Sequence, residues 1–254
     1  MTEFDGLAES YDRTRGGESR GDEYAAGLDA VLPPGDGAIL EIGVGTGVVA
    51  LGLRHRGRRV VGLDLSEPMI ARAHDRLGDV VVRSDAMRMS IGTDSVDHAL
   101  SVWVVHSVAD PVRHFEEAAR VVRPGGTYVV CLAQRPAADD EIGNLIASMS
   151  RRVDERRGAA RPRGVTVEQV TGWGETAGWV GSIHRFERSW LSAPEDELEA
   201  IALRQWPALR ELDEASIEEV TRPVVDALRA MPQEVGLRRG TVEAIVFRRG
   251  AARR

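Results

Sequence analysis

The sequence contains no lysine: all 33 residues counted as lysine or arginine are arginine. A lysine-free chain cannot carry the Tyr-x-x-x-Lys pair of many nicotinamide-dependent oxidoreductases. Cysteine occurs once, as Cys131, which excludes an intrachain disulfide and favours a reducing compartment. Long apolar runs are also missing, and residues 1–10 lack the basic and apolar regions of a signal peptide. We therefore expect a cytoplasmic protein that does not interact with a membrane.

Positive charge is in deficit as well, and the formal net charge is −7 at pH 7. Proteins whose main partner is nucleic acid usually present a basic surface, so this balance disfavours such a partner. The hydrophobic content of 43% and the charged content of 29% are typical of a globular protein. With 254 residues, the chain is long enough for one large domain or two small ones.

What the sequence does have is a glycine-rich turn between an apolar strand pattern and an apolar helix pattern, at Ala38–Leu51. The apolar run ends at Glu41, and glycines follow at positions 43, 45 and 47. Glycine suits a turn whose backbone must approach a ligand closely, because a Cβ would block the contact. The amides at the start of the next helix then face that ligand. A dinucleotide fingerprint, G-x-G-x-x-G, would need a glycine in place of Val48.

Strand and helix patterns alternate between residue 38 and residue 133. After a first strand that ends near Glu41, strands are predicted at 59–64, 80–82, 95–103 and 127–133, the last after a turn at 123–126. Helices are predicted at 48–56, 67–76 and 111–122. The looser part of the chain is expected to hold helices at 139–157 and 167–177, strands at 182–190 and 242–248, and a helical insertion at 195–231. This rhythm predicts an α/β fold with a doubly wound, mainly parallel, seven-stranded sheet and helices on both faces.

The carboxyl ends of parallel strands meet at one edge of a sheet, where ligands of such folds bind. Asp64 ends the second strand and could accept both hydroxyl protons of a ribose. The alternative for Asp64 is an N-cap of the next helix, but Ser66 is better placed for that position. Asp85 follows the third strand and could accept from an adenine amino group, while the Ala86 amide donates to a ring nitrogen. An ordinary turn aspartate is the alternative for Asp85.

Together these segments resemble class I S-adenosylmethionine-dependent methyltransferases. The matching stretches are Leu40–Gly47, Val61–Asp64, Ser84–Ala86, Asp97–Asp110 and Ala119–Gly126. The E-x-G-x-G-x-G spacing is similar to the family's first motif, and R-V-V-R-P-G-G is similar to its turn before the fifth strand. The chain looks most like the small-molecule group, methyltransferase type 11, that includes quinone- and natural-product-biosynthesis enzymes. The resemblance implies a Rossmann-like fold, S-adenosylmethionine as cofactor and S-adenosylhomocysteine as product.

The resemblance also implies roles for individual residues. The three loop glycines would border the methionine portion of the cofactor and Asp64 would hold its ribose. Asp85 and Ala86 would bind the adenine, and the side chains of Leu65 and Met69 would pack on the adenine face. The expected cofactor-binding residues are Tyr11, Glu41, Gly43, Gly45, Gly47, Asp64, Leu65, Met69, Asp85, Ala86 and Trp103.

Two residues are candidates for a catalytic role. His106 follows the fourth strand, and an imidazole with a reference pKa of about 6.5 suits deprotonation of a methyl acceptor. A hydrogen-bonded structural histidine is the alternative. Tyr11 lies in Phe4–Asp12, a segment similar to the family's N-terminal lid, where it would close over the cofactor or else pack within a helix. Trp103 would pack against the cofactor or belong to the core.

Two other chemistries are disfavoured. His106, Asp110 and His114 have the spacing of a metal-binding helix face, but Pro111 interrupts that helix, and no metal is expected. The Asn/Asp-Pro-Pro-Tyr/Phe element of methyltransferases that act on nucleobase amines is missing, which disfavours a DNA base as acceptor.

We therefore predict methyl transfer from S-adenosylmethionine to an oxygen, nitrogen or carbon of a small molecule, such as a natural product or a quinone-like compound. An RNA or protein methyltransferase on the same fold is one alternative, and a cofactor-binding protein that does not methylate is another. The predicted organisation is a lid segment at 1–35, a cofactor-binding core at 36–190 with an insertion at about 136–165, a helical cap at 191–240, and a last strand and tail at 241–254.

Overall fold

The computed structural model describes residues 5–6, 8–158 and 165–250. The chain divides into two compact units. The first contains residues up to 133, 165–186 and those from 242 onwards, and the second contains residues 134–164 and 187–241. Strands β5 (Val122–Pro136), β6 (Trp179–Ser192) and β7 (Gly236–Arg249) each cross the division. Phe4, Leu7 and residues 159–164 lie outside the described part, and the predicted cap role of 191–240 stays a prediction.

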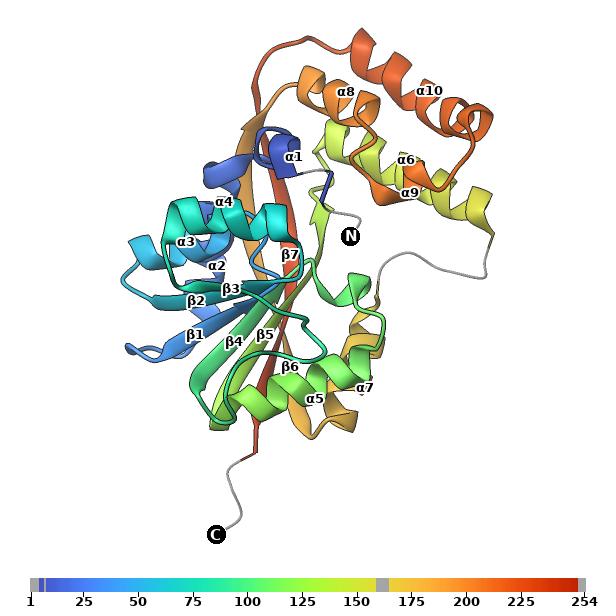
Figure 1. Cartoon of the computed structure of the whole chain (residues 1–254). Helices are drawn as coiled ribbons and strands as arrows, with labels where there is room; N and C mark the ends of the chain where they lie inside the picture. Colours follow the sequence, from blue (N-terminus) through green and yellow to red (C-terminus); the bar gives the residue numbers. More distant parts are fainter. Residues whose placement is uncertain (1–4, 7, 159–164, 251–254) are drawn as a thin grey trace. The chain divides into compact units, whose positions relative to one another are not determined.

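The sheet has seven strands in the order β3-β2-β1-β4-β5-β7-β6 (Figure 1). The first four strands are β1 (Ala38–Ile42), β2 (Arg59–Asp64), β3 (Val81–Arg83) and β4 (Val96–Val102). These four and β5 pair in parallel, so that their carboxyl ends lie at one edge. The predicted α/β fold with a seven-stranded, mainly parallel sheet is confirmed.

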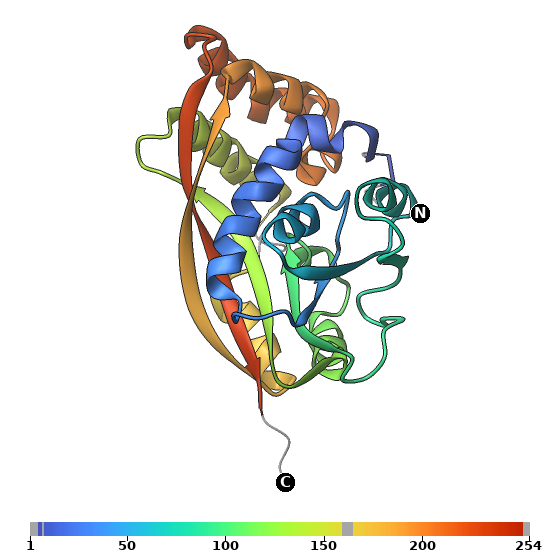
Figure 2. The same ribbon diagram turned by 90° about the vertical axis from the view of Figure 1, so that its left-hand side faces the viewer.

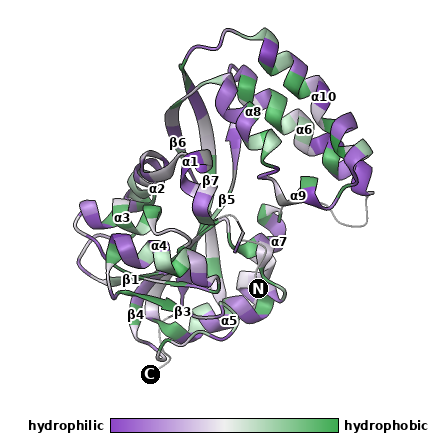
Figure 3. Cartoon of the chain, turned by 45° about the horizontal axis from the view of Figure 1, so that its top comes forward, coloured by the Kyte–Doolittle hydropathy of each residue, from purple (hydrophilic) through white to green (hydrophobic). Residues whose placement is uncertain are grey.

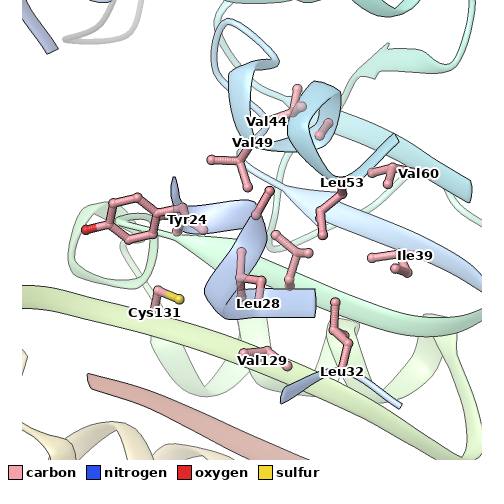
Figure 4. Close-up of a cluster of buried hydrophobic side chains, with 14 of the residues drawn as sticks. Tyr24, Leu28, Leu32, Ile39, Val44, Val49, Leu53, Val60, Val129 and Cys131 are labelled. Atoms are coloured by element: carbon pink, nitrogen blue, oxygen red, sulfur yellow. The ribbon is translucent and has the colours of Figure 1, made fainter. Parts of the chain in front are cut away.

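Both faces of the sheet in the first unit are buried. Successive side chains of a strand point to opposite faces, so each strand contributes to two apolar clusters. One face packs against α2 (Gly17–Val31), α3 (Val48–His55) and α4 (Glu67–Leu77), and Figure 4 shows Leu28 and Leu53 among its apolar side chains. The other face packs against α5 (Pro111–Val121) and α7 (Val167–Thr176). Strand β1 shows the alternation directly, since Ile39 belongs to the first cluster and Leu40 to the second.

Most predicted boundaries agree with the structure to within two residues, but the predicted turn at 123–126 was wrong. Those residues lie inside β5, which starts at Val122. The register between β4 and β5 shifts there, since Val96 pairs with Val122 while His98 pairs with Thr127. Between these two pairs β5 has three more residues than β4, and Gly125 there adopts a φ of +84°. The segment therefore forms an irregularity within one strand and does not end it.

The N-terminal helices of the first unit are α1 (Ala8–Arg15) and α2, and α2 lies alongside α3 (Figure 2). Gly21 of α2 faces the first residue of α3, and a Cβ at this position would lie 2.3 Å from the carbonyl oxygen of Val48. Gly52 of α3 faces α2 in the same way, because a Cβ at this position would lie 2.8 Å from the Cβ of Ala25. Small residues thus set the close approach of α2 to the start of α3, which directly follows the glycine-rich turn.

The second unit has a core of its own, built by α6 (Glu141–Arg157), α8 (Pro194–Ala202), α9 (Pro207–Arg210) and α10 (Glu214–Ala230). Figure 3 shows apolar and polar residues alternating along these helices, as expected for amphipathic helices. The buried guanidinium of Arg238 contacts Asp140, 3.0 Å away, and Glu197, 2.7 Å away. None of the helices in the described ranges is long and apolar enough to cross a membrane.

Gly21→Ala should lower the free energy of unfolding by about 1–3 kcal/mol, because the new methyl group would overlap a backbone carbonyl that only a shift of α3 can relieve. Gly172→Ala in α7 is the matched control, since a Cβ there meets no atom within 4 Å. Alanine in an open helix position should stabilise by about 0.5–1 kcal/mol relative to glycine. Denaturant unfolding measures both variants, and wild-type stability of Gly21→Ala would contradict the close packing.

Candidate active site

The glycine-rich turn joins β1 to α3 at the carboxyl edge of the sheet. Gly43, Gly45 and Gly47 have φ angles of +73°, +54° and +86°, which disfavour any residue with a Cβ. At Gly43 a Cβ would also lie 2.3 Å from the side chain of Val104, so this glycine serves packing. At Gly45 a Cβ would meet no atom within 4 Å. The backbone of the turn therefore has open space beside it at Gly45, which leaves room for a ligand.

Asp64, the last residue of β2, binds two backbone amides with its carboxylate. One oxygen accepts from the Gly45 N–H at 2.9 Å and the other from the Ser66 N–H at 2.8 Å. Burial raises the pKa of Asp64, and these amides oppose the shift. Since each oxygen has two acceptor positions, one on each remains for the two hydroxyl groups of a ribose. Ser66 occupies the N-cap position of α4, but its side chain makes no capping hydrogen bond.

The N-terminal segment is tied to the same loops. The hydroxyl of Thr46, between the glycines, donates to Asp12 at 2.5 Å, and Arg76 donates both to Asp12 and, at 2.7 Å, to the Thr46 carbonyl. The Ser66 hydroxyl donates to Asp5 at 2.7 Å. Tyr11 lies next to Asp12 in α1 and is partly exposed. We call the contacts of Asp12 with Thr46 and Arg76 the lid latch.

Glu41, at the end of β1, is only 2% exposed. Among the described residues, its Oε2 atom has no hydrogen-bond partner. Burial raises the pKa of Glu41 to about 8, with a smaller contribution from the charge of Asp64. The carboxyl group is therefore poised to lose its proton when a cation binds, since an opposite charge favours the ionised form.

The loop after β3 carries Asp85 and Ala86. The Asp85 carboxylate accepts from the Met87 N–H at 2.8 Å, and both Asp85 and Ala86 are partly exposed. Leu65, on the neighbouring loop after β2, is 47% exposed, whereas Met69 is buried. Of the two side chains predicted to pack on an adenine, Leu65 is the accessible one.

The end of β4 is occupied by Trp103, whose φ of +57° is unusual for a bulky residue. Its ring packs edge-on against Tyr24 with centroids 4.6 Å apart, and the guanidinium carbon of Arg20 lies 3.5 Å from its centroid. His106 follows in a short 3-10 helix, Val105–Ser107, and is exposed. This edge of the sheet thus combines an aromatic surface, a fixed cation and an exposed imidazole.

His114 does not share a site with His106. It is fully buried and lies 2.6 Å from the Tyr128 hydroxyl. Burial lowers the pKa of His114 to about 4. Within the ranges that the structure describes, no three acidic, histidine or cysteine side chains group as a metal site would require.

Residues 40–130 match the sequence model of a family described as a methyltransferase domain. The chain is 33% identical over 140 residues to the demethylmenaquinone methyltransferase of Clavibacter sepedonicus, covering 52% of this chain and 57% of that protein. This part of the chain is similar to class I S-adenosylmethionine-dependent methyltransferase domains. The resemblance stated from the motifs is confirmed. The chain spans less than two thirds of the length of the curated relatives it matches.

Solved structures share the methyltransferase fold over nearly the whole chain. A Thermotoga maritima methyltransferase, described as a possible histamine N-methyltransferase, is 19% identical with a TM-score of 0.59, covering 97% of this chain and 98% of that one. The (4+2) cyclase SpnF is 18% identical with a TM-score of 0.60, covering 98% and 94%. At these identities the likeness concerns the fold.

The residues present fit the family's cofactor, S-adenosylmethionine. Gly45 offers an open backbone, Asp64 has free acceptor positions, and the unpartnered Oε2 of Glu41 can accept from an ammonium group. Asp12 and Arg20 contact residues of the candidate site, and sequence reasoning did not single them out. Asp12 lies beside the predicted Tyr11, but Arg20 carries no local signal in an arginine-rich chain, because only the packing of α2 brings it to Trp103.

Glu41→Gln should become more stable than the wild type as the pH rises from about 5 to 9. Folding raises the pKa of Glu41 from 4.5 to about 8, so its contribution to stability is fully present below pH 4.5 and is lost as the pH approaches 8. A glutamine does not ionise and avoids this loss. Thermal melting across the pH range measures the difference between the two proteins.

The matched control is Glu67→Gln, which changes a carboxylate whose side chain is 78% exposed and should follow the wild type at every pH. A melting difference between Glu41→Gln and the wild type that does not change with pH would contradict the raised pKa. The stabilised variant should nevertheless bind S-adenosylhomocysteine more weakly at pH 8, because an amide cannot supply the negative charge for the ligand's ammonium group.

Proposed function

We propose that this protein transfers the methyl group of S-adenosylmethionine to a small aromatic acceptor that reacts through a hydroxyl-bearing, quinol-like ring. The observation that carries the cofactor assignment is the Asp64 carboxylate, which bonds Gly45 and Ser66 yet keeps an acceptor position on each oxygen. An NAD-type fingerprint would have a glycine in place of Val48. The geometry therefore supports a nucleoside ligand of the methyltransferase family.

Each loop of the sheet edge has a distinct part in this proposal. The cofactor supplies a methyl group made electrophilic by a sulfonium. Glu41 would bind the ammonium end of the methionine, Asp64 the ribose, and Asp85 with Ala86 the adenine. Leu65 would cover the adenine face and Tyr11 would close over the bound molecule. Catalysis in this arrangement rests on alignment of the reacting atoms and exclusion of water.

The acceptor class follows from the charge at the end of β4. The guanidinium of Arg20 on Trp103 would stabilise a phenolate-like acceptor and repel an ammonium-bearing amine. An aromatic acceptor could also stack on the exposed part of the Trp103 ring. His106 would accept the proton that the acceptor's hydroxyl group gives up. The relatives named demethylmenaquinone methyltransferases act, by their names, on a quinone precursor, which supports the same class.

Two alternatives have less support. The net charge of −7 disfavours RNA as the acceptor. The likeness to the cyclase SpnF leaves a non-methylating role compatible with the fold, because fold alone does not determine function. Turnover with a quinol would separate methyl transfer from that role.

Asp64→Ala should weaken the binding of S-adenosylhomocysteine at least tenfold, which corresponds to about 1.4 kcal/mol. The substitution removes both the ribose acceptor and the anchor of the Gly45 amide. Calorimetric titration measures the affinity, with Asp226→Ala on the exposed side of α10 as a control that should bind like the wild type. Tight binding of NADH, or no binding of S-adenosylhomocysteine by the wild type, would overturn the cofactor assignment.

Arg20→Gln should lower kcat/KM for a hydroquinone acceptor about tenfold or more, with the affinity for S-adenosylhomocysteine changed less than threefold. Removing the guanidinium removes the charge that would stabilise the phenolate-like acceptor, worth about 1.4 kcal/mol per tenfold. Arg222→Gln, an exposed arginine of α10 paired with Glu218, is the control and should keep full activity. Methylation of amines but not of hydroquinones by the wild type would contradict the proposed acceptor class.

A further inference from the structure

Three buried side chains form a continuous hydrogen-bonded chain inside the first unit. Ser101 of β4, Tyr128 of β5 and His114 of α5 are each 0% exposed. The Ser101 hydroxyl lies 2.9 Å from the Tyr128 hydroxyl, which lies 2.6 Å from the Nε2 atom of His114. The Nδ1 atom of His114 lies 3.2 Å from the carbonyl oxygen of Ala86. This series of hydrogen bonds therefore ends at the loop that follows β3.

The end of this chain fixes the direction of every proton in it. A carbonyl oxygen can only accept, so the proton of the imidazole is on Nδ1 and donates to Ala86. Nε2 of the neutral ring then accepts from Tyr128, whose oxygen accepts from Ser101. One tautomer of His114 satisfies all of these groups at once. The chain is thus a rigid support for one backbone carbonyl.

These hydrogen-bonded polar side chains lie in an aromatic part of the core, where polar groups are unusual. His114 and Tyr128 are surrounded by aromatic rings, with Phe115 5.4 Å and Trp179 5.8 Å from Tyr128 between centroids. Polar groups in such surroundings are costly unless each is hydrogen-bonded. Apolar side chains of similar shape would fill the same space without that cost. What the polar side chains add is the hydrogen bond to Ala86.

The peptide group between Ala86 and Met87 is held on both sides. His114 donates to its carbonyl oxygen, and its N–H donates to the Asp85 carboxylate at 2.8 Å. The orientation of this peptide therefore sets the orientation of the Asp85 carboxylate. The oxygen of Asp85 that bonds Met87 is Oδ1, which leaves Oδ2 to accept from a ligand.

The rest of the loop is fastened to the same helix face. Glu117 accepts from the Met89 N–H at 2.8 Å, and Arg120 donates to the Met89 carbonyl at 2.9 Å. His114, Glu117 and Arg120 are three residues apart, so they lie on one side of α5. Side chains of α5 therefore bond backbone groups of the loop after β3 at several points. His114 bonds the part of this loop next to Asp85.

We propose that His114, supported by Tyr128 and Ser101, is a positioning residue that orients Asp85 and thereby makes the site selective for a 6-aminopurine over a 6-oxopurine. This inference rests on the proposed function, in which Asp85 and Ala86 bind the base. An adenine offers an amino donor to Oδ2 of Asp85 and a ring acceptor to the Ala86 N–H. A hypoxanthine presents a carbonyl acceptor and a ring N–H at those positions, so the fixed Asp85 carboxylate and the donating Ala86 N–H reject it.

The test compares the dissociation constants of S-adenosylhomocysteine and S-inosylhomocysteine by calorimetry. The wild type should prefer the adenosyl compound by at least tenfold. His114→Leu should reduce that preference at least fivefold, through weaker binding of the adenosyl compound, with the affinity for the inosyl compound changed less than threefold. His114→Asn, whose amide nitrogen can take the place of Nδ1, should restore most of the preference. A merely structural loss would weaken both compounds together and leave their ratio unchanged.

Tyr128→Phe is the second variant, since it keeps the ring and removes the donor to His114. It should lower the preference in the same direction and by a smaller factor, and it decides the matter if His114→Leu does not fold. Thr221→Val in α10, which removes a buried hydroxyl bonded at 2.8 Å to Ile217, is the control for a lost buried hydrogen bond and should keep the wild-type ratio.

Three results have different meanings. A wild type that binds neither compound overturns the proposed function, and this inference with it. A wild type that binds both compounds equally, or a folded His114→Leu that keeps the wild-type ratio within twofold, overturns the inference alone. If His114→Leu is unfolded, an unchanged ratio in Tyr128→Phe does the same.

Discussion

The hydrogen bonds of one carboxylate hold together two of the loops on which the proposed site is built. Asp64 ends β2, and its two oxygens bind the amide of Gly45 in the turn after β1 and the amide of Ser66 before α4. The parallel pairing of β1 with β2 brings these three groups to one edge of the sheet. Without that carboxylate the left-handed turn would lose its anchor.

The site is assembled by two independent means. The loops after β1 and β2 are joined by backbone amides around Asp64, whereas the loop after β3 is held by side chains of α5. Alignment of a nucleoside needs both, since its ribose and its base would rest on different loops. A helix that packs on the far side of the sheet from α3 therefore helps to shape the same ligand site.

The sequence predicted the region from β1 to α5 closely, because period-two and helical patterns and the glycine spacing are local signals. Local signals also explain the failure at β5, where Arg123–Gly126 has turn composition but forms an irregular part of the strand. The contacts of Asp12 with Thr46, Arg20 with Trp103 and His114 with Ala86 could not be predicted. Each joins residues more than 25 positions apart, and only the packed helices bring them together.

The lid latch bears on the order of events in a catalytic cycle. Asp12 bonds Thr46 inside the glycine-rich turn and the guanidinium of Arg76, and both are charge-assisted hydrogen bonds. A ligand bound against that turn would share Thr46 with the N-terminal helix. Release of the ligand would then be coupled to the opening of α1, so that a change that weakens the latch would also speed release.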